Sequence, residues 1–155
     1  MAAGEQAGYA RTDDLNGYRQ EGFGPLDMTV HQGARWSAAD AYLRPAEGRS
    51  NLSVRQGEIA ARVLFERDGG GAEPRAIGVE VERFNRRGGG GGARKVLRAR
   101  KEVISCGGAV NSPQLLLLSG IGPTEQLTAH GIELMAHAPG VGQNLQDHLD
   151  LYVQM

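Results

Sequence analysis

Three segments in the middle of the chain carry the hydrophobic pattern of β-strands. Residues 58–65 and 76–81 are apolar runs that contain Ile and Val, and residues 95–100 alternate apolar and basic side chains. β-branched residues favour strands, and alternation indicates a strand that buries one face. Glycine-rich stretches at 68–74 and 85–93 separate the three runs, and such stretches are strong turn signals. The pattern therefore predicts an antiparallel three-stranded meander.

Five shorter apolar runs are further candidates for strands. The run at 101–105 is expected to be a buried strand that follows the meander. The other four candidate strands are 28–30, 52–54, 133–137 and 149–153.

The N-terminal residues 1–26 are polar and glycine-rich and show no clear period, so we expect a loop or tail there.

Two helices are predicted from the residues at their ends. Ser37 and Asp40 have the spacing of a capping box, with Asp in place of the more usual Glu. This helix should stop near Pro45. A second helix is expected to have Pro123 in its first turn and Gly131 just past its end, because these are the positions that proline and glycine favour.

The stretch SCGGAVNSPQLLLLSGIG, residues 105–122, predicts a strand–turn–helix unit. Gly107 and Gly108 lack a Cβ, so the backbone can approach a bound group closely at this turn. The turn follows the carboxyl end of a predicted strand, which is where open α/β sheets place their ligands. From these residues alone, a nucleotide site and a packed structural turn both remain open.

The helix within this stretch has its own start and stop signals. Ser112 can cap it, and Pro113 suits its first turn. The four leucines at 115–118 cover more than one face, so we expect the helix to pack on several sides. Gly120 can take the left-handed conformation that ends a helix.

Complete nucleotide-binding signatures are absent from the sequence. Three Gly-x-Gly triplets, at 22–24, 120–122 and 140–142, each lack the third glycine of the G-x-G-x-x-G pattern. No G-x-x-x-x-G-K-[ST] motif occurs. On motif grounds the chain therefore carries no complete dinucleotide site of its own.

Composition narrows the classes of function that need to be considered. The chain has 155 residues and a net charge of −1, which gives no electrostatic case for nucleic acid or an anionic membrane. Cys106 is the single cysteine, so a disulfide within the chain and a cysteine zinc site are both excluded. No apolar run approaches the ~20 residues of a membrane span. The first residues lack the apolar region of a signal peptide.

Long motifs in the chain resemble the glucose–methanol–choline (GMC) oxidoreductases. GAVNSPQLLLLSGIG (108–122) is similar to the second signature of that family, and PGVGQNLQDH (139–148) is similar to its Gly-x-Asn-Leu-x-Asp-His loop. Residues 14–43 resemble the choline-oxidising members in particular, through EGFG and RWSAA. The resemblance covers roughly residues 14–153.

The resemblance implies a fold and a reaction. The fold class is α/β: a partial FAD-binding, Rossmann-like domain with an antiparallel β-meander, plus pieces of a substrate domain. The implied boundaries are 1–27 for a loop or tail on the substrate-domain side, 28–148 for the partial FAD-binding domain, and 149–155 for the start of a substrate-domain strand. The implied reaction is FAD-dependent oxidation of an alcohol, with choline going to betaine aldehyde.

Four cofactor-binding residues are implied on the strand and turn side of the motif. Ala60 stands where family members usually have a Val whose main chain reads the FAD adenine. Cys106, Gly107 and Gly108 match the strand-end Ala-Ala-Gly of the family, which lies close to the dinucleotide. Cys106 is interpreted as a small packing residue and not as a redox thiol.

The loop at 139–148 implies three more cofactor-side residues, Asn144, Asp147 and His148. His148 is expected to help shape the cofactor region. The other histidines, His31, His130 and His137, are not interpreted as catalytic; His130 is expected in the last turn of a helix, where a positive charge suits the dipole.

No catalytic residue and no metal site are assigned to this chain. Family members are much longer, so their G-x-G-x-x-G motif would precede Met1 and their catalytic His would follow Met155. We therefore expect a central segment of the enzyme that is inactive alone. Its expected partners are a small alcohol substrate, with choline favoured, and the missing N- and C-terminal parts of the enzyme; no nucleic acid is expected.

Two alternatives stay open beside the choline-type flavoprotein. One keeps the enzyme class and changes the substrate to another primary alcohol, because the aromatic and acidic residues that surround a quaternary ammonium cannot be located here. The other is a truncated product that no longer binds flavin and is at most a structural piece. The location implied by resemblance is the mitochondrial inner membrane, and membrane association rests on resemblance alone.

Overall fold

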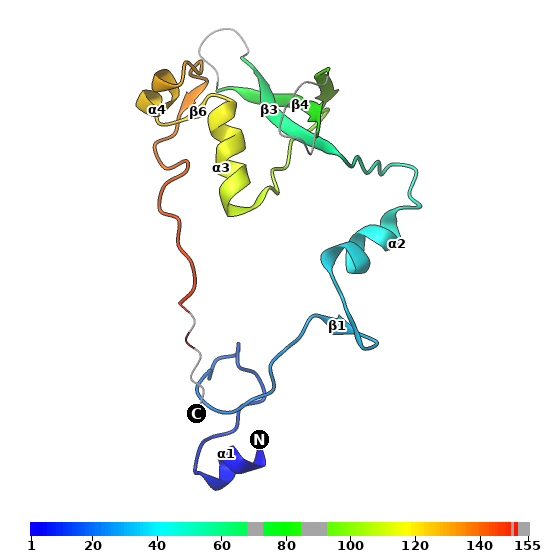
Figure 1. Ribbon diagram of the computed structural model, residues 1–155, viewed down its shortest axis with the longest axis vertical. Helices are drawn as coiled ribbons and strands as arrows, with labels where there is room; N and C mark the ends of the chain where they lie inside the picture. The colour runs from blue at the N-terminus through cyan, green and yellow to red at the C-terminus, as the bar shows by residue number, and fades with distance from the viewer. Residues whose placement is uncertain (68–72, 85–92, 150, 152–155) are drawn as a thin grey trace. The chain divides into compact units, whose positions relative to one another are not determined.

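The computed structural model describes residues 1–67, 73–84, 93–149 and 151 (Figure 1). The chain separates into two compact units, residues 1–54 and residues 55–155, and each is described by itself. Most of the two predicted glycine turns and most of the candidate strand at 149–153 lie outside the described residues. The domain boundaries implied at 27/28 and 148/149 stay a prediction.

The first unit begins with a short helix, α1 (Ala2–Gln6), where the sequence predicted a loop or tail. That prediction was wrong for these residues because a tertiary contact fixes them. Gly4 lies against the ring of Phe23, so closely that a Cβ would be 3.0 Å from its Cγ. The polar composition of the segment gives no sign of this contact.

A small hairpin follows, formed by β1 (Val30–His31) and β2 (Ala34–Arg35). Its two turn residues, Gln32 and Gly33, have φ angles of 49° and 76°. Positive φ at both central residues is typical of the tight turns that match strand twist. The strand expected at 28–30 is confirmed only at Val30.

The predicted capping box at Ser37 is confirmed. The Asp40 N–H donates to Ser37 Oγ at 3.2 Å, and the Ser37 N–H donates to Asp40 Oδ2 at 3.3 Å. The helix opens as a π-helical segment, η1 (Ala39–Leu43), and continues as α2 (Arg44–Ala46). The helix ends at Ala46, one residue past Pro45, so the predicted stop near Pro45 is confirmed.

The strand expected at 52–54 is not formed, and this prediction was wrong. Leu52 and Val54 are 38% and 43% exposed, and no strand of the described residues pairs with them. A short apolar run without a hydrogen-bonding neighbour does not form a ladder.

The second unit is built on the predicted meander, which is confirmed. Strands β3 (Glu58–Glu66), β4 (Arg75–Arg83) and β5 (Lys95–Arg98) form an antiparallel sheet in the order β3-β4-β5. The register of β3 against β4 shifts between Ala60 and Arg62. One extra residue on β3 therefore forms a β-bulge, and such bulges bend a strand and re-aim its side chains.

Helix α3 (Gly108–Leu118) follows the meander and packs beside β3 and β6 (Figure 1). It begins five residues earlier than predicted: Gly107 and not Ser112 is its N-cap, and Pro113 lies inside the helix. The prediction that α3 packs on several sides was also wrong, since none of its residues is fully buried and Leu118 is 49% exposed. Among the described residues, little else covers its surface.

The remaining elements are β6 (Ile121–Gly122), α4 (Thr124–Ala129) and β7 (Ala136–His137). Strand β7 pairs in parallel with β6 and is shorter than the predicted strand at 133–137. The predicted glycine stops are confirmed: Gly120 follows α3 with φ 84°, and Gly131 follows α4 with φ 65°.

Residues 101–105 do not form the buried strand that the sequence predicted. They are irregular, and Ile104 is 74% exposed. A strand needs a neighbour to accept and donate its backbone hydrogen bonds, and no described segment lies in register with this one. Apolar side chains alone could not reveal that the neighbour is missing.

Candidate functional site

A cavity of about 350 Å³ lies where the chain turns from residues 103–107 into α3. One wall comes from the turn, a second from α3, and a third from the start of β3 with Val79 of β4. Ligand pockets usually span about 300–1,000 Å³, so this cavity is large enough for part of a dinucleotide and too small for the whole. Its lining residues are Ile59, Ala60, Val79, Val103, Ile104, Ser105, Cys106, Gly107, Asn111, Gln114, Leu115 and Leu118.

Two glycines shape the turn at the mouth of this cavity. Gly107 caps α3, and a Cβ there would lie 3.2 Å from Asn111 Cβ and from the Ser112 backbone nitrogen. Gly108 has φ 83°, which disfavours other residues. A Cβ on Gly108 would meet no atom within 4 Å. The backbone at Gly108 therefore borders open space into which another group could come close.

The start of α3 presents backbone N–H groups beside the cavity. Its N-cap, Gly107, supplies no side-chain hydrogen bond. The first backbone N–H groups of a helix have no partner within the helix, and the helix dipole adds partial positive charge there. Asn111, in the first turn, also lines the cavity. This combination suits a polar or anionic group of a ligand.

Ala60 reaches the cavity from the bulged part of β3. The methyl group is small, so ligand contacts at this position must come mainly from the main chain. The bulge supplies a main chain that departs from regular ladder geometry at this point. The structure therefore brings three predicted cofactor residues together, Ala60, Cys106 and Gly107, with Gly108 adjoining.

The other predicted cofactor residues, Asn144, Asp147 and His148, do not line this cavity. They lie in an irregular segment after β7, where the Asp147 Oδ1 accepts the His148 N–H at 2.8 Å and Asn144 has φ 55°. The neighbouring residues 140–143 and Leu145 line a separate cavity of about 510 Å³ against α3. The described geometry does not bring the two groups of predicted residues together.

Sequence reasoning missed the two polar residues that α3 contributes to the cavity, Asn111 and Gln114. They are three positions apart, so they share one face of α3. The sequence does contain a signal for this role, because Asn111 and Gln114 follow the Gly107–Gly108 pair closely. It was overlooked because the helix was expected to begin at Ser112, which would have placed Asn111 outside it.

No charged side chain is among the residues that line the cavity. The clear pKa shifts in the described chain belong to other places. At the start of β3, two hydrogen bonds of 2.6 Å from the Arg55 guanidinium hold the pKa of Glu58 below its usual value and raise the pKa of Arg55. The cavity is therefore suited to binding and orienting a group, and its lining offers no carboxylate or imidazole for acid–base chemistry.

Two histidines that do not line the cavity have identifiable contacts. The ring of His31 lies 4.6 Å, centroid to centroid, from Trp36. His137 Nδ1 lies 2.8 Å from Thr124 Oγ1 at the start of α4. In the part of the chain that is described, no group of three or more His, Cys, Asp or Glu side chains could hold a metal ion. Nor does any helix there have the length and apolarity to cross a membrane.

Comparison with known proteins places the chain in a class. Residues 1–150 match the N-terminal domain of the GMC oxidoreductases. The chain belongs to the GMC oxidoreductase family, and the matched domain is the FAD-binding domain of that family. The α/β fold class expected from the sequence is confirmed by this match.

Curated proteins that are similar to this chain carry more specific names within the GMC oxidoreductase family. "Oxygen-dependent choline dehydrogenase" of Brucella anthropi is 50% identical over 99% of this chain and 26% of its own length. "Choline dehydrogenase, mitochondrial" of Homo sapiens is 51% identical over 99% of this chain and 24% of its own length. The mouse protein of the same name is 50% identical. The chain thus spans about a quarter of the length of these curated relatives.

The residues around the cavity fit part of the family's cofactor. FAD has a flat adenine ring and an anionic pyrophosphate, and the cavity joins apolar walls to two amide side chains and the N-terminal end of a helix. Gly108 leaves room where a side chain would otherwise stand. The fit concerns one portion of the cofactor, in keeping with the size of the cavity.

Proposed function

We propose that the chain is part of an FAD-dependent oxidoreductase that acts on CH–OH donors and oxidises choline to betaine aldehyde. The observation that carries this proposal is the identity of 50–51% to choline dehydrogenases along 99% of the chain. The glycine turn and cavity at the start of α3 support it, because they give the chain a place where a nucleotide cofactor fits.

The contribution of this chain is to bind and orient the cofactor. FAD, when bound, accepts the hydride that leaves the carbinol carbon of the alcohol. We assign the main chain of Ala60 to one edge of the cofactor's adenine. Cys106, Gly107 and Gly108 form the turn that lies against the dinucleotide, with Cys106 acting as a small packing residue.

Asn144, Asp147 and His148 are proposed to shape a second part of the cofactor region. The support is their motif, Asn-Leu-Gln-Asp-His, and the adjoining cavity of about 510 Å³ between residues 140–145 and α3. No residue of this chain is assigned the role of the base that takes the hydroxyl proton. That group, and the surroundings of the substrate ammonium, are proposed to lie in other parts of the enzyme.

The test uses the complete protein that carries this sequence, purified and examined by absorption spectroscopy. We expect a bound flavin spectrum that bleaches when choline is added without oxygen. A matched alcohol that lacks the quaternary ammonium, ethanolamine, should bleach it more slowly. Absence of flavin contradicts the proposed function, whereas faster reduction by ethanolamine keeps the enzyme class and contradicts choline as substrate.

The 155-residue chain alone is expected to show no yellow flavin spectrum and no choline oxidation. FAD bound to it at near-stoichiometric level would contradict the proposal that other parts of the enzyme complete the site. We also propose a mitochondrial, inner-membrane location on the family resemblance. The mammalian relatives are named as mitochondrial, whereas the Brucella relatives are bacterial.

A further inference from the structure

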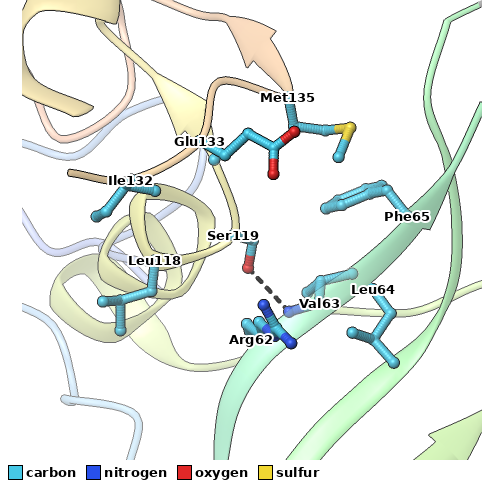
Figure 2. A pocket seen from close by; sticks show the side chains of 10 residues that line it. Arg62, Val63, Leu64, Phe65, Leu118, Ser119, Ile132, Glu133 and Met135 are labelled. Atoms are coloured by element: carbon cyan, nitrogen blue, oxygen red, sulfur yellow. Dashed lines mark hydrogen bonds between the residues drawn. The ribbon is translucent and has the colours of Figure 1, made fainter. Parts of the chain in front are cut away.

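Ser119, just past the end of α3, is a buried polar residue that joins the helix to the meander. Its side-chain oxygen accepts the Val63 N–H of β3 at 2.8 Å (Figure 2). Its hydroxyl donates to the Leu115 carbonyl oxygen. Ser119 is 9% exposed and Val63 is 7% exposed. One hydroxyl therefore serves two backbone groups in an environment with little water.

This connection lies close to the cofactor cavity along both elements. On β3, Val63 lies past the bulge that separates Ala60 from Arg62 in the register. On α3, Leu118 precedes Ser119 and lines the cofactor cavity together with Ala60. The Ser119 bond thus fixes the distance between two walls of the cavity, the β3 wall that contains Ala60 and the α3 wall that contains Leu118.

Few other hydrogen bonds could take over this task. Within the described residues, two hydrogen bonds join β3 or the residue after it to the chain from Ser119 onward. One is the Ser119–Val63 bond, and the other runs from the Arg67 side chain to the Met135 carbonyl oxygen. Arg67 is an exposed side chain beyond the far end of β3 from Ala60. Loss of the Ser119 hydroxyl would leave the buried Val63 N–H without a partner, which proteins strongly disfavour.

We propose that Ser119 is a positioning residue for FAD: it holds the Ala60 edge of β3 at the spacing from α3 that the adenine portion requires. It touches no cofactor atom in this account and acts through Val63. The inference rests on the proposed function, because the cavity must be the FAD site for its spacing to matter.

The structure also predicts which substitution should preserve this role. Another cavity, of about 200 Å³, lies beside Ser119, between β3 and residues 132–135, as Figure 2 shows. Its lining includes Phe65 and Met135. One added methyl group can be accommodated there, so Ser119→Thr should keep the hydroxyl and both hydrogen bonds.

The experiment measures FAD affinity of the complete protein, stripped of flavin and titrated with FAD well below its unfolding temperature. Ser119→Ala is expected to weaken FAD binding about tenfold, the effect of roughly one lost hydrogen bond. Ser119→Thr is expected to bind like the wild type. Leu127→Ala is the control for a purely structural defect, because Leu127 is 1% exposed and lies in α4, away from the cavity.

The outcomes separate the inference from the proposed function. Wild-type protein that takes up no FAD contradicts the proposed function, and this inference with it. Wild-type protein that binds FAD contradicts the inference alone if Ser119→Ala keeps its affinity, if Leu127→Ala weakens binding as much, or if Ser119→Thr is as impaired as Ser119→Ala. Faster hydrogen exchange of the Val63 amide in Ser119→Ala, restored in Ser119→Thr, would support it.

Discussion

The α-carbon of Gly78 in β4 faces the carbonyl oxygen of Leu97 in β5 so closely that any Cβ at position 78 would collide with it. Gly78 pairs with Arg98 in the register of the meander. The close approach lets β5 complete the sheet that carries Val79, which lines the cavity at the start of α3. A glycine inside a strand often marks such an approach of two backbones.

Gly78→Ala is therefore expected to destabilise the second unit. The added methyl group must push β5 away, and overpacking of this kind costs about 1–3 kcal/mol of the free energy of unfolding. Urea denaturation of the wild type and the variant measures the difference. Gly48→Ala is the control, because a Cβ there meets no atom within 4 Å. Equal stability of Gly78→Ala and the wild type would contradict the assigned strand register.

Leu127 is the most deeply buried large side chain among those described, at 1% exposure. Its truncation to Ala is expected to cost about 2–5 kcal/mol of unfolding free energy, because it removes buried methyl groups and leaves a cavity. Leu134→Ala is the matched control, since Leu134 is 40% exposed and should lose much less. Thermal and urea unfolding compare the two, and a similar loss in both would mean that α4 is not packed as described.

The capping box of the first unit makes a prediction about pH. The hydrogen bond from the Ser37 hydroxyl, followed by the charge of Arg44, holds the pKa of Asp40 below the usual aspartate value. The stabilisation from ionised Asp40 is therefore present above the pKa of the unfolded chain and is lost as the pH falls through the folded pKa. Helix start η1 should loosen only in that acid range.

Carbon NMR of the Asp40 carboxyl checks this directly. Ser37→Ala removes the largest cause of the shift, so the measured pKa of Asp40 should rise towards its ordinary value. Arg44→Gln should raise it as well, since it removes an opposite charge. An unchanged Asp40 pKa in Ser37→Ala would show that the Ser37 hydroxyl does not donate a hydrogen bond to the Asp40 carboxylate in solution.

The elements that the sequence predicted correctly were those fixed by local signals. The meander follows from alternation between glycine stretches, and the reciprocal bonds of Ser37 and Asp40 follow from their spacing. The stops at Gly120 and Gly131 follow from the conformational freedom of glycine. These features depend on residues close together in the sequence.

The elements that the sequence predicted wrongly depend on distant partners. Helix α1 rests on the contact of Gly4 with Phe23, and residues 101–105 lack a strand to pair with among the described residues. The bond between Ser119 and Val63 spans 56 positions, and no local pattern announces it.

The candidate site also combines residues that local motifs predict with residues whose positions depend on distant packing. A family motif pointed to Cys106 and Gly107, and the structure brings them together with Ala60 around one cavity. Asn111 and Gln114 were missed because the expected helix start was misplaced. The positions of Asn144 and His148 relative to this cavity depend on long-range packing, so their cofactor role stays a prediction.

Hydrogen–deuterium exchange of the complete protein, with and without FAD, tests the central claim most directly. If the turn at 105–108, the start of α3 and the bulged part of β3 bind the cofactor, FAD should slow amide exchange at Gly108–Asn111 and around Ala60. Exchange in α4 should change little. Unchanged exchange at Gly108–Asn111 in protein saturated with FAD would contradict the account.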